Sequence, residues 1–133
     1  MTEYKIENAT IDSTALGVAN TDHGILSFVI GLDYGGGGQG FGQIVLDNYS
    51  EKLKRRIPTI LASSLLLCVD EVWGKDWEDL KGLPCRAYHT WGNVFAIGHY
   101  LKDKWLWFDK IKMEFVVTTF KEMAKDAEAK HDD

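Results

Sequence analysis

The chain alternates between short apolar segments and longer segments with a helical repeat. Residues 25–32 are rich in branched and aromatic side chains, which is typical of a strand. Residues 4–11 alternate more weakly between apolar and polar positions, and residues 41–46, 84–89 and 94–99 have the same strand character. The pattern therefore predicts strands at these places.

Two other segments predict helices. In residues 57–73 apolar side chains recur every three or four positions, and Gly74 follows as a stop signal. Asp109 is suited to be the N-cap of a second helix that would extend to Ala127. Residues 114–120 also have strand propensity.

The order β-β-β-α-β-β-α brings the strands in adjacent pairs. We therefore expect an α+β fold with a mostly antiparallel sheet and about two helices packed against one face. The length of 133 residues favours a single domain, residues 1–133, with residues 128–133 as a frayed tail. Residues 102–108 are interpreted as an aromatic, basic connector between the last strand and the last helix.

Glycine is concentrated in residues 33–43, where it occupies six of eleven positions. Gly35, Gly37 and Gly40 satisfy a dinucleotide-binding pattern, but a strand follows here instead of the helix that such a site requires. A phosphate-binding P-loop is excluded because Gln43 follows the last glycine. Two readings remain open: a structural bulge or subunit contact, or a bare backbone whose N–H groups bind an anionic ligand.

Charge and cysteine usage narrow the class of protein. The net charge of −5 and the pI near 5.3 do not favour passive binding to DNA or to an anionic membrane. Cys68 and Cys85 lack the spacing of a metal site or of a disulfide framework. No signal peptide or apolar run of membrane-spanning length is apparent. We expect a soluble protein of a reducing compartment.

The histidines offer little catalytic chemistry. They stand at His23, His89, His99 and His131, and none has zinc-protease spacing. His89 and His99 flank the second strand pair, and either could act as a general base. No serine, cysteine or carboxylate stands at a telling distance from them. We therefore expect no catalytic residue, no metal site and no cofactor.

Cations and aromatic residues suggest where a phosphorylated ligand would bind. The chain has three arginines, Arg55, Arg56 and Arg86, and arginine recognises phosphate in a bidentate manner. Residues 102–108 combine lysines with three aromatic side chains, which suits a nucleobase that carries phosphates. The alternative, that these aromatic side chains belong to the core or to an interface, is the more common arrangement.

Several stretches together resemble one family. The most specific are residues 35–42, with the glycine-rich run, and residues 97–105, with the sequence I-G-H-Y-L-K-D-K-W. The weaker ones are residues 6–11, residues 22–25, and residues 77–82 leading to Arg86. Across about residues 4–110 the chain resembles the first-described Thoeris anti-defence sponge family of phage and prophage proteins.

The resemblance implies sequestration of an immune signal. Such proteins bind a glycocyclic ADP-ribose, and some also bind cyclic oligonucleotides, without cleaving the ligand. The resemblance further implies homodimers or hexamers built from dimers, action in the host cell cytoplasm, and neither DNA nor membrane as a partner. Family ligand contacts include arginines of the C-terminal helix, where this chain has only lysines. The expected ligand contacts are Gly38, Gln39, Gly40, Phe41, Arg56, Arg86, His99, Lys102, Trp105 and Lys121.

Two alternatives stay open. The first is an enzyme that cleaves a nucleotide, with His89 or His99 as its acid or base. The second is an inhibitor that binds a protein component of a bacterial defence or CRISPR system. No long acidic face supports the inhibitor, since the acidic residues are interleaved with lysines.

Overall fold

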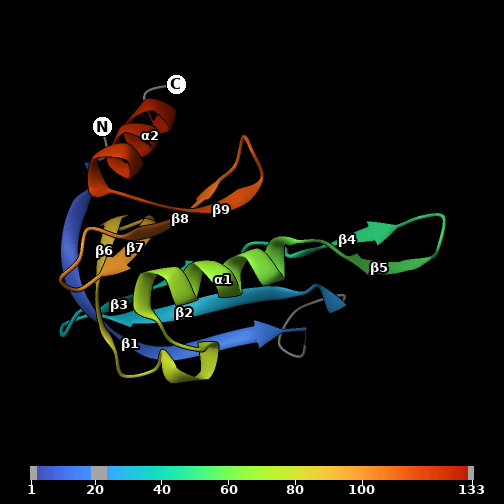
Figure 1. The fold of residues 1–133 in the computed structure, drawn as a ribbon, viewed down its shortest axis with the longest axis horizontal. Coiled ribbons are helices and arrows are strands. Elements are labelled where there is room, and N and C mark those ends of the chain that lie inside the picture. Colours follow the sequence, from blue (N-terminus) through green and yellow to red (C-terminus); the bar gives the residue numbers. More distant parts are fainter. Residues whose placement is uncertain (1–2, 19–23, 132–133) are drawn as a thin grey trace.

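The computed structural model describes residues 3–18 and 24–131, so His23 and the last two residues lie outside the described part. It confirms an α+β fold built on a large antiparallel sheet with two helices in the described chain (Figure 1). The elements in chain order are β1 Lys5–Gly17, β2 Ser27–Asp33, β3 Gly38–Gly42, β4 Asp47–Ser50, β5 Arg55–Pro58, α1 Leu61–Trp73, the short 3-10 helix η2 Trp77–Asp79, β6 Pro84–Thr90, β7 Asn93–His99, β8 Trp105–Asp109, β9 Glu114–Thr118 and α2 Phe120–His131.

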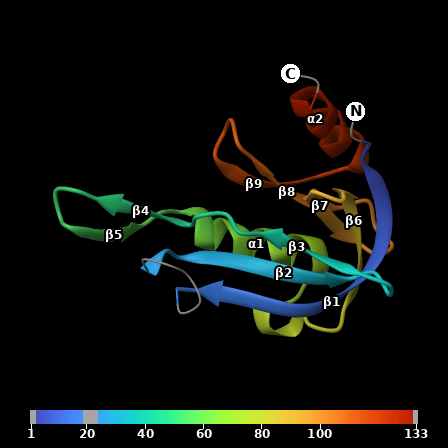
Figure 2. The ribbon, with the colours of Figure 1, turned by 180° about the vertical axis from the view of Figure 1, so that it is seen from behind.

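The first strand joins the two halves of the sheet. The strand order in the described residues is β3-β2-β1-β6-β7-β8-β9. The first half of β1, from Lys5 to Thr10, pairs with β6, and the second half, from Thr10 to Gly17, pairs with β2. A register shift between Ile11 and Ser13 interrupts the second half, and such bulges increase the bend of a strand. The sheet curves along β1 (Figure 2), and β3 at its end lies beside β7.

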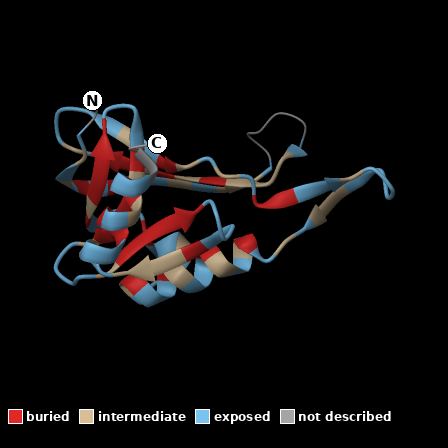
Figure 3. Cartoon of the chain, turned by 90° about the horizontal axis from the view of Figure 1, so that it is seen from above, coloured by how far each residue is buried: buried red, intermediate tan, exposed pale blue. Residues whose placement is uncertain are grey.

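The two helices pack on opposite faces of the sheet. α1 buries Leu61, Leu65, Val69 and Val72 in the larger core, together with Phe28 of β2 and other residues. α2 instead contributes Met123, Ala124 and Ala127 to a second core formed with Tyr88, Trp105 and Trp107. Figure 3 shows the buried strands between the helices. The expectation that both helices cover one face is therefore wrong.

The segment before the last helix is a strand hairpin. Residues 102–108, interpreted as a connector, contain most of β8, and residues 114–118 form β9. All five residues of β8 are buried, because α1 covers one face of this strand and α2 the other. Such a strand lacks the apolar–polar alternation that identifies a half-exposed one.

The second helix begins later than its sequence pattern predicts. Asp109 is not its N-cap: the carboxylate accepts hydrogen bonds from the N–H groups of Ile111 and Lys112, at 3.0 and 3.1 Å, in the turn between β8 and β9. α2 starts at Phe120, whose N–H donates to the Asp103 carboxylate at 2.7 Å. The expected tail of residues 128–133 begins inside α2, which continues to His131.

A hairpin formed by β4 and β5 extends away from the body (Figure 1). Arg56 donates two hydrogen bonds to the Asp47 carboxylate, from Nε at 2.8 Å and from Nη2 at 2.7 Å. The hydrogen bond from Arg56 holds the pKa of Asp47 below its ordinary value. This ion pair joins the two strands at the base of the hairpin, where Asp47 is buried.

The glycine run forms the hairpin between β2 and β3. Asp33 pairs with Gly38 and Val29 pairs with Gly42, so the run continues directly into a ladder strand. Gly42 has a φ of 121°, and a Cβ there would lie 2.7 Å from the Phe28 ring. A close approach to the neighbouring strand accounts for this glycine without a ligand.

Candidate functional site

The expected ligand contacts do not form one site. Four of them, Arg86, His99, Lys102 and Trp105, lie together and are called the Arg86 corner below. Arg56 lies on the projecting hairpin, and Lys121 is exposed in the first turn of α2. The remaining four are in β3.

In the Arg86 corner, the arginine holds the turn between β7 and β8. Its Nε donates to the carbonyl oxygen of His99 and its Nη2 to that of Lys102, both at 2.9 Å. Its guanidinium carbon lies 4.8 Å from the centre of the Trp105 ring, which is fully buried. This geometry orders the chain around the arginine, and it directs two of the arginine's donor groups to the backbone instead of to a ligand.

His99 also faces its own chain. Its Nδ1 accepts hydrogen bonds from the N–H groups of Leu101 and Lys102, both at 3.0 Å. Burial, and then the charges of Lys102, Arg86 and Lys104, lower the pKa of His99. The Arg86 corner is therefore a positively charged part of the surface, with a histidine that resists protonation.

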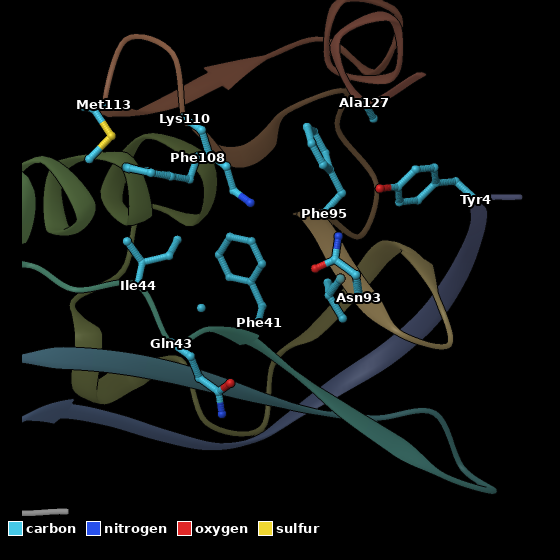
Figure 4. Close-up of a pocket in the computed structure, with 12 residues that line it drawn as sticks. Tyr4, Phe41, Gln43, Ile44, Asn93, Phe95, Phe108, Lys110, Met113 and Ala127 are labelled. Atoms are coloured by element: carbon cyan, nitrogen blue, oxygen red, sulfur yellow. The ribbon is translucent and has the colours of Figure 1, made fainter. Parts of the chain in front are cut away.

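A pocket of about 740 Å³ lies elsewhere, between the end of β3, the start of β7 and the β8–β9 hairpin (Figure 4). Its lining consists mainly of aromatic and aliphatic side chains, with two amides and one lysine. The lining residues are Tyr4, Phe41, Gly42, Gln43, Ile44, Asn93, Val94, Phe95, Phe108, Lys110, Met113 and Ala127. Phe41 is the expected ligand contact that lines it.

The pocket places polar groups beside aromatic rings. Figure 4 shows the Lys110 amine directed into the space between Phe108 and Phe41, with Phe95 on the other side and the Gln43 amide extending away. Within the described residues the side chains of Asn93 and Lys110 make no hydrogen bond or ion pair. Aromatic faces can stack on a flat ring, and a lysine can neutralise an anion. These polar groups are therefore available to a bound molecule.

The pocket and the Arg86 corner lie at different ends of the sheet. Asn93 begins β7 and His99 ends it. A strand rises about 3.3 Å per residue, so these two ends are about 20 Å apart. The two sequence stretches that carry Arg86 and His99 therefore do not contribute their charged groups to the pocket.

Most pocket residues were missed because they come from separate segments. Tyr4 precedes β1, Asn93 and Phe95 belong to β7, and Lys110 lies in the turn after β8. Asn93 lies just outside the strand predicted for residues 94–99. No local spacing signals that these residues meet, since the curvature of the sheet brings them together.

The described residues contain no group of three or more histidine, cysteine, aspartate or glutamate side chains that could hold a metal ion. Among the helices described, none is long and apolar enough to cross a membrane. Burial raises the pKa of the Cys85 thiol to about 12, so this cysteine is an inert core group at neutral pH.

Comparison with protein-family models, with curated proteins and with solved structures found no match to this chain.

Proposed function

We propose that the protein is a phage or prophage anti-defence protein that binds and sequesters a cyclic nucleotide second messenger, glycocyclic ADP-ribose or a cyclic oligonucleotide. The ligand is held in the host cell cytoplasm and is not cleaved. The observation that carries the proposal is the pocket beside Phe41, with a volume of about 740 Å³. Pockets for small molecules typically have about 300–1,000 Å³ and combine apolar walls with a few polar groups.

Each part of such a ligand has a suitable partner in the pocket. The adenine would pack against Phe95, whose side chain is only partly buried, since aromatic side chains bind the flat faces of bases. The Asn93 amide would hydrogen-bond to the base or a ribose. Lys110 would lie against the pyrophosphate. Binding without turnover requires no nucleophile or metal.

The direct test is calorimetric titration with glycocyclic ADP-ribose and with cyclic oligonucleotides, followed by heating of the complex and analysis of the released ligand. We expect saturable binding and recovery of intact ligand. Release of a hydrolysed product would instead support the nucleotide-cleaving enzyme.

Two lysines of the same turn provide a matched pair of variants. Lys110→Gln should weaken binding about tenfold, because a hydrogen bond to a charged group contributes more than a neutral one. Lys112→Gln, at an exposed position that does not line the pocket, should leave the affinity unchanged. Equal affinities of the two variants would show that Lys110 does not contact the ligand.

Assembly into homodimers or hexamers is also part of the proposal. In the described residues the sheet has β3 and β9 as its edge strands. Outside the sheet, Leu67 of α1 is an apolar side chain that is 71 % exposed. Light scattering coupled to gel filtration would give the mass of the assembly. A monomer at micromolar concentration would contradict this part.

A second function is favoured by the hairpin of β4 and β5. Tyr49 and Leu53 are 51 % and 53 % exposed on it, beside the cations Lys52 and Lys54. Arg55 is also exposed on this hairpin, and aromatic side chains and arginine are enriched in protein interfaces. This surface would suit a protein-binding inhibitor of a bacterial defence or CRISPR component. Removal of both apolar side chains by Tyr49→Ser and Leu53→Ser would then abolish inhibition while nucleotide binding persists.

A further inference from the structure

Two residues that line the pocket have a left-handed backbone. Gln43 has a φ of 61° and Met113 has a φ of 54°. Among the described residues, one further non-glycine residue has a positive φ, Lys54 with 57°. This conformation is uncommon for a residue with a long side chain, because its Cβ lies too close to the following carbonyl oxygen. Backbone strain of this kind is typical of ligand sites, so each pocket residue requires an explanation.

The left-handed backbone of Gln43 has a structural explanation. β3 ends at Gly42, and the N–H of Gln43 donates to the carbonyl oxygen of Phe28 at 2.7 Å. The N–H of Leu46 then donates to the carbonyl oxygen of Leu26 at 2.9 Å, so the chain continues beside the same segment. Figure 4 shows the amide of Gln43 extending away from the other pocket side chains. The turn at the end of β3 therefore accounts for this residue.

Met113 has no comparable explanation in the turn between β8 and β9. It directly precedes Glu114, which pairs with Asp109 at the open end of the hairpin. The Asp109 carboxylate already fixes this turn through the N–H groups of Ile111 and Lys112. The left-handed position of a hairpin loop usually holds glycine or asparagine. Glycine would form the same turn without strain, so the turn does not require a methionine side chain.

The core does not require this side chain either. Met113 is 57 % exposed, and an apolar side chain that remains in water contributes little to folding. It nevertheless lines the pocket, and Figure 4 shows it beside Phe108 at the edge of the pocket, on the side of Ile44. Met113 therefore lies at the mouth of the pocket, where a bound molecule would cover it. Methionine suits such a position, because its flexible and polarisable side chain adapts to the shape of a partner.

The neighbouring Lys110 indicates what kind of molecule would cover Met113. Lys110 precedes it by three residues in the same turn and lines the same pocket, with its amine directed between Phe108 and Phe41 (Figure 4). An anionic group would bind the amine. The thioether and the phenylalanine rings provide no partner for a second charge. The turn therefore suits an anionic group that is attached to a flat or aliphatic body.

We propose that Met113 is a specificity-determining residue of the pocket, kept in a left-handed backbone because its side chain covers the apolar body of a bound anion at the pocket mouth. The identity of that anion as a cyclic nucleotide rests on the function proposed above, whereas the contact with Met113 does not. Covering about half of a methionine side chain is worth roughly a fivefold change in an equilibrium. Loss of the side chain should weaken binding by that factor.

The first measurement is the melting temperature of two matched variants. Met113→Gly and Lys54→Gly each introduce glycine at a left-handed residue of a hairpin turn. Glycine adopts this conformation without strain, which offsets the greater freedom of the unfolded chain. Neither variant should therefore melt more than about 2 °C below the unaltered protein. A larger decrease that is confined to Met113→Gly would show that the side chain stabilises the fold, and would overturn the proposal.

The second measurement is calorimetric titration with glycocyclic ADP-ribose. Met113→Gly should weaken binding roughly fivefold. Met113→Leu preserves the apolar volume and should retain most of the affinity. Ile111→Ser changes a residue of the same turn that is 81 % exposed and does not line the pocket, so it should bind as the unaltered protein does. Unchanged affinity in Met113→Gly, or an equal loss in Met113→Leu, would overturn the role of Met113.

A probe that is not a nucleotide separates the two proposals. The fluorescent anion 1-anilinonaphthalene-8-sulfonate joins flat rings to one sulfonate group. Its binding should weaken in Lys110→Gln, which would locate it in the pocket, and roughly fivefold in Met113→Gly. If it behaves in this way but glycocyclic ADP-ribose does not bind, the proposed function fails and the role of Met113 stands. If neither molecule binds the unaltered protein, the pocket is not a ligand site and both proposals fail.

Discussion

The Arg86 corner and the pocket contain the same kinds of residue in two different situations. Both combine aromatic rings with cations, the chemistry that suits a nucleotide. In the corner the arginine donates to two backbone carbonyl groups and stacks on a buried ring. In the pocket Lys110 and Asn93 make no such contact within the described residues. A residue type that suits a ligand therefore indicates a site only when its polar atoms are not already engaged by the chain.

The strongest challenge to this comparison is Trp105→Ala. Truncating a large, fully buried aromatic side chain costs about 3–5 kcal/mol of unfolding free energy, and Trp105 contacts both Arg86 and Phe120. Chemical denaturation would measure the loss. Trp91→Ala, at a ring that is 67 % exposed, should lose much less stability. Similar losses of stability in the two variants would show that the contacts of Trp105 in the Arg86 corner do not stabilise the fold.

Arg86→Ala should have the next largest effect. It removes two hydrogen bonds to carbonyl groups and the contact with the Trp105 ring, and we expect a loss of about 1–3 kcal/mol of unfolding free energy. The affinity of the folded protein for glycocyclic ADP-ribose should not change, because the pocket lies at the other end of β7. Calorimetry below the unfolding temperature would check this. A large loss of affinity would show that the ligand binds at the Arg86 corner and not in the pocket.

Asn93→Ala changes a residue that should contribute to ligand affinity and not to stability. Its side chain is exposed to the pocket and makes no hydrogen bond within the described chain, so stability should change by less than about 0.5 kcal/mol. Affinity should fall about fivefold if the amide bonds the ligand. If the variant loses stability but keeps its affinity, Asn93 stabilises the fold and does not contact the ligand.

The smallest effect concerns His99. Its pKa is lowered in the folded state, so the unfolded chain binds the proton more readily. The stability that this group contributes is present above about pH 6.5, the ordinary value, and decreases as the pH falls. We expect a decrease in melting temperature of about 1–2 °C between neutral and mildly acidic pH. In His99→Asn, whose side-chain oxygen can accept the same N–H groups, this component of the pH dependence should be absent.

The sequence predicted the parts of the fold that have one exposed face. The repeat in residues 57–73 identified α1, because this helix buries a single stripe against the sheet. The predicted start was wrong, since α1 begins at Leu61 and residues 57 and 58 belong to β5. It did not identify β8, since helices cover both faces of that strand and the alternation is lost. Asp109 has the chemistry of a helix cap, but it serves a β-turn instead.

The candidate site was less predictable than the fold. Arg86 and Trp105 meet because both pair with Gly98 of β7, and this approach could not be predicted from a sequence in which residues 102–108 were interpreted as a connector. The pocket is formed by residues that lie far apart in the sequence. Tyr4, Phe41 and Lys110 meet because the sheet curves and β3 reaches β7, and no short-range spacing in the sequence encodes that approach.

The course of β1 also has a consequence for folding. Its first residues pair with the end of β6, so that Lys5 lies opposite His89, far along the chain. A contact between such distant residues closes a long loop, which slows folding. On the ribosome, the first half of β1 is synthesised early but cannot pair until β6 has emerged. β1 is thus completed only after residues 84–90 have been made, and until then its pairing edge is open to other strands.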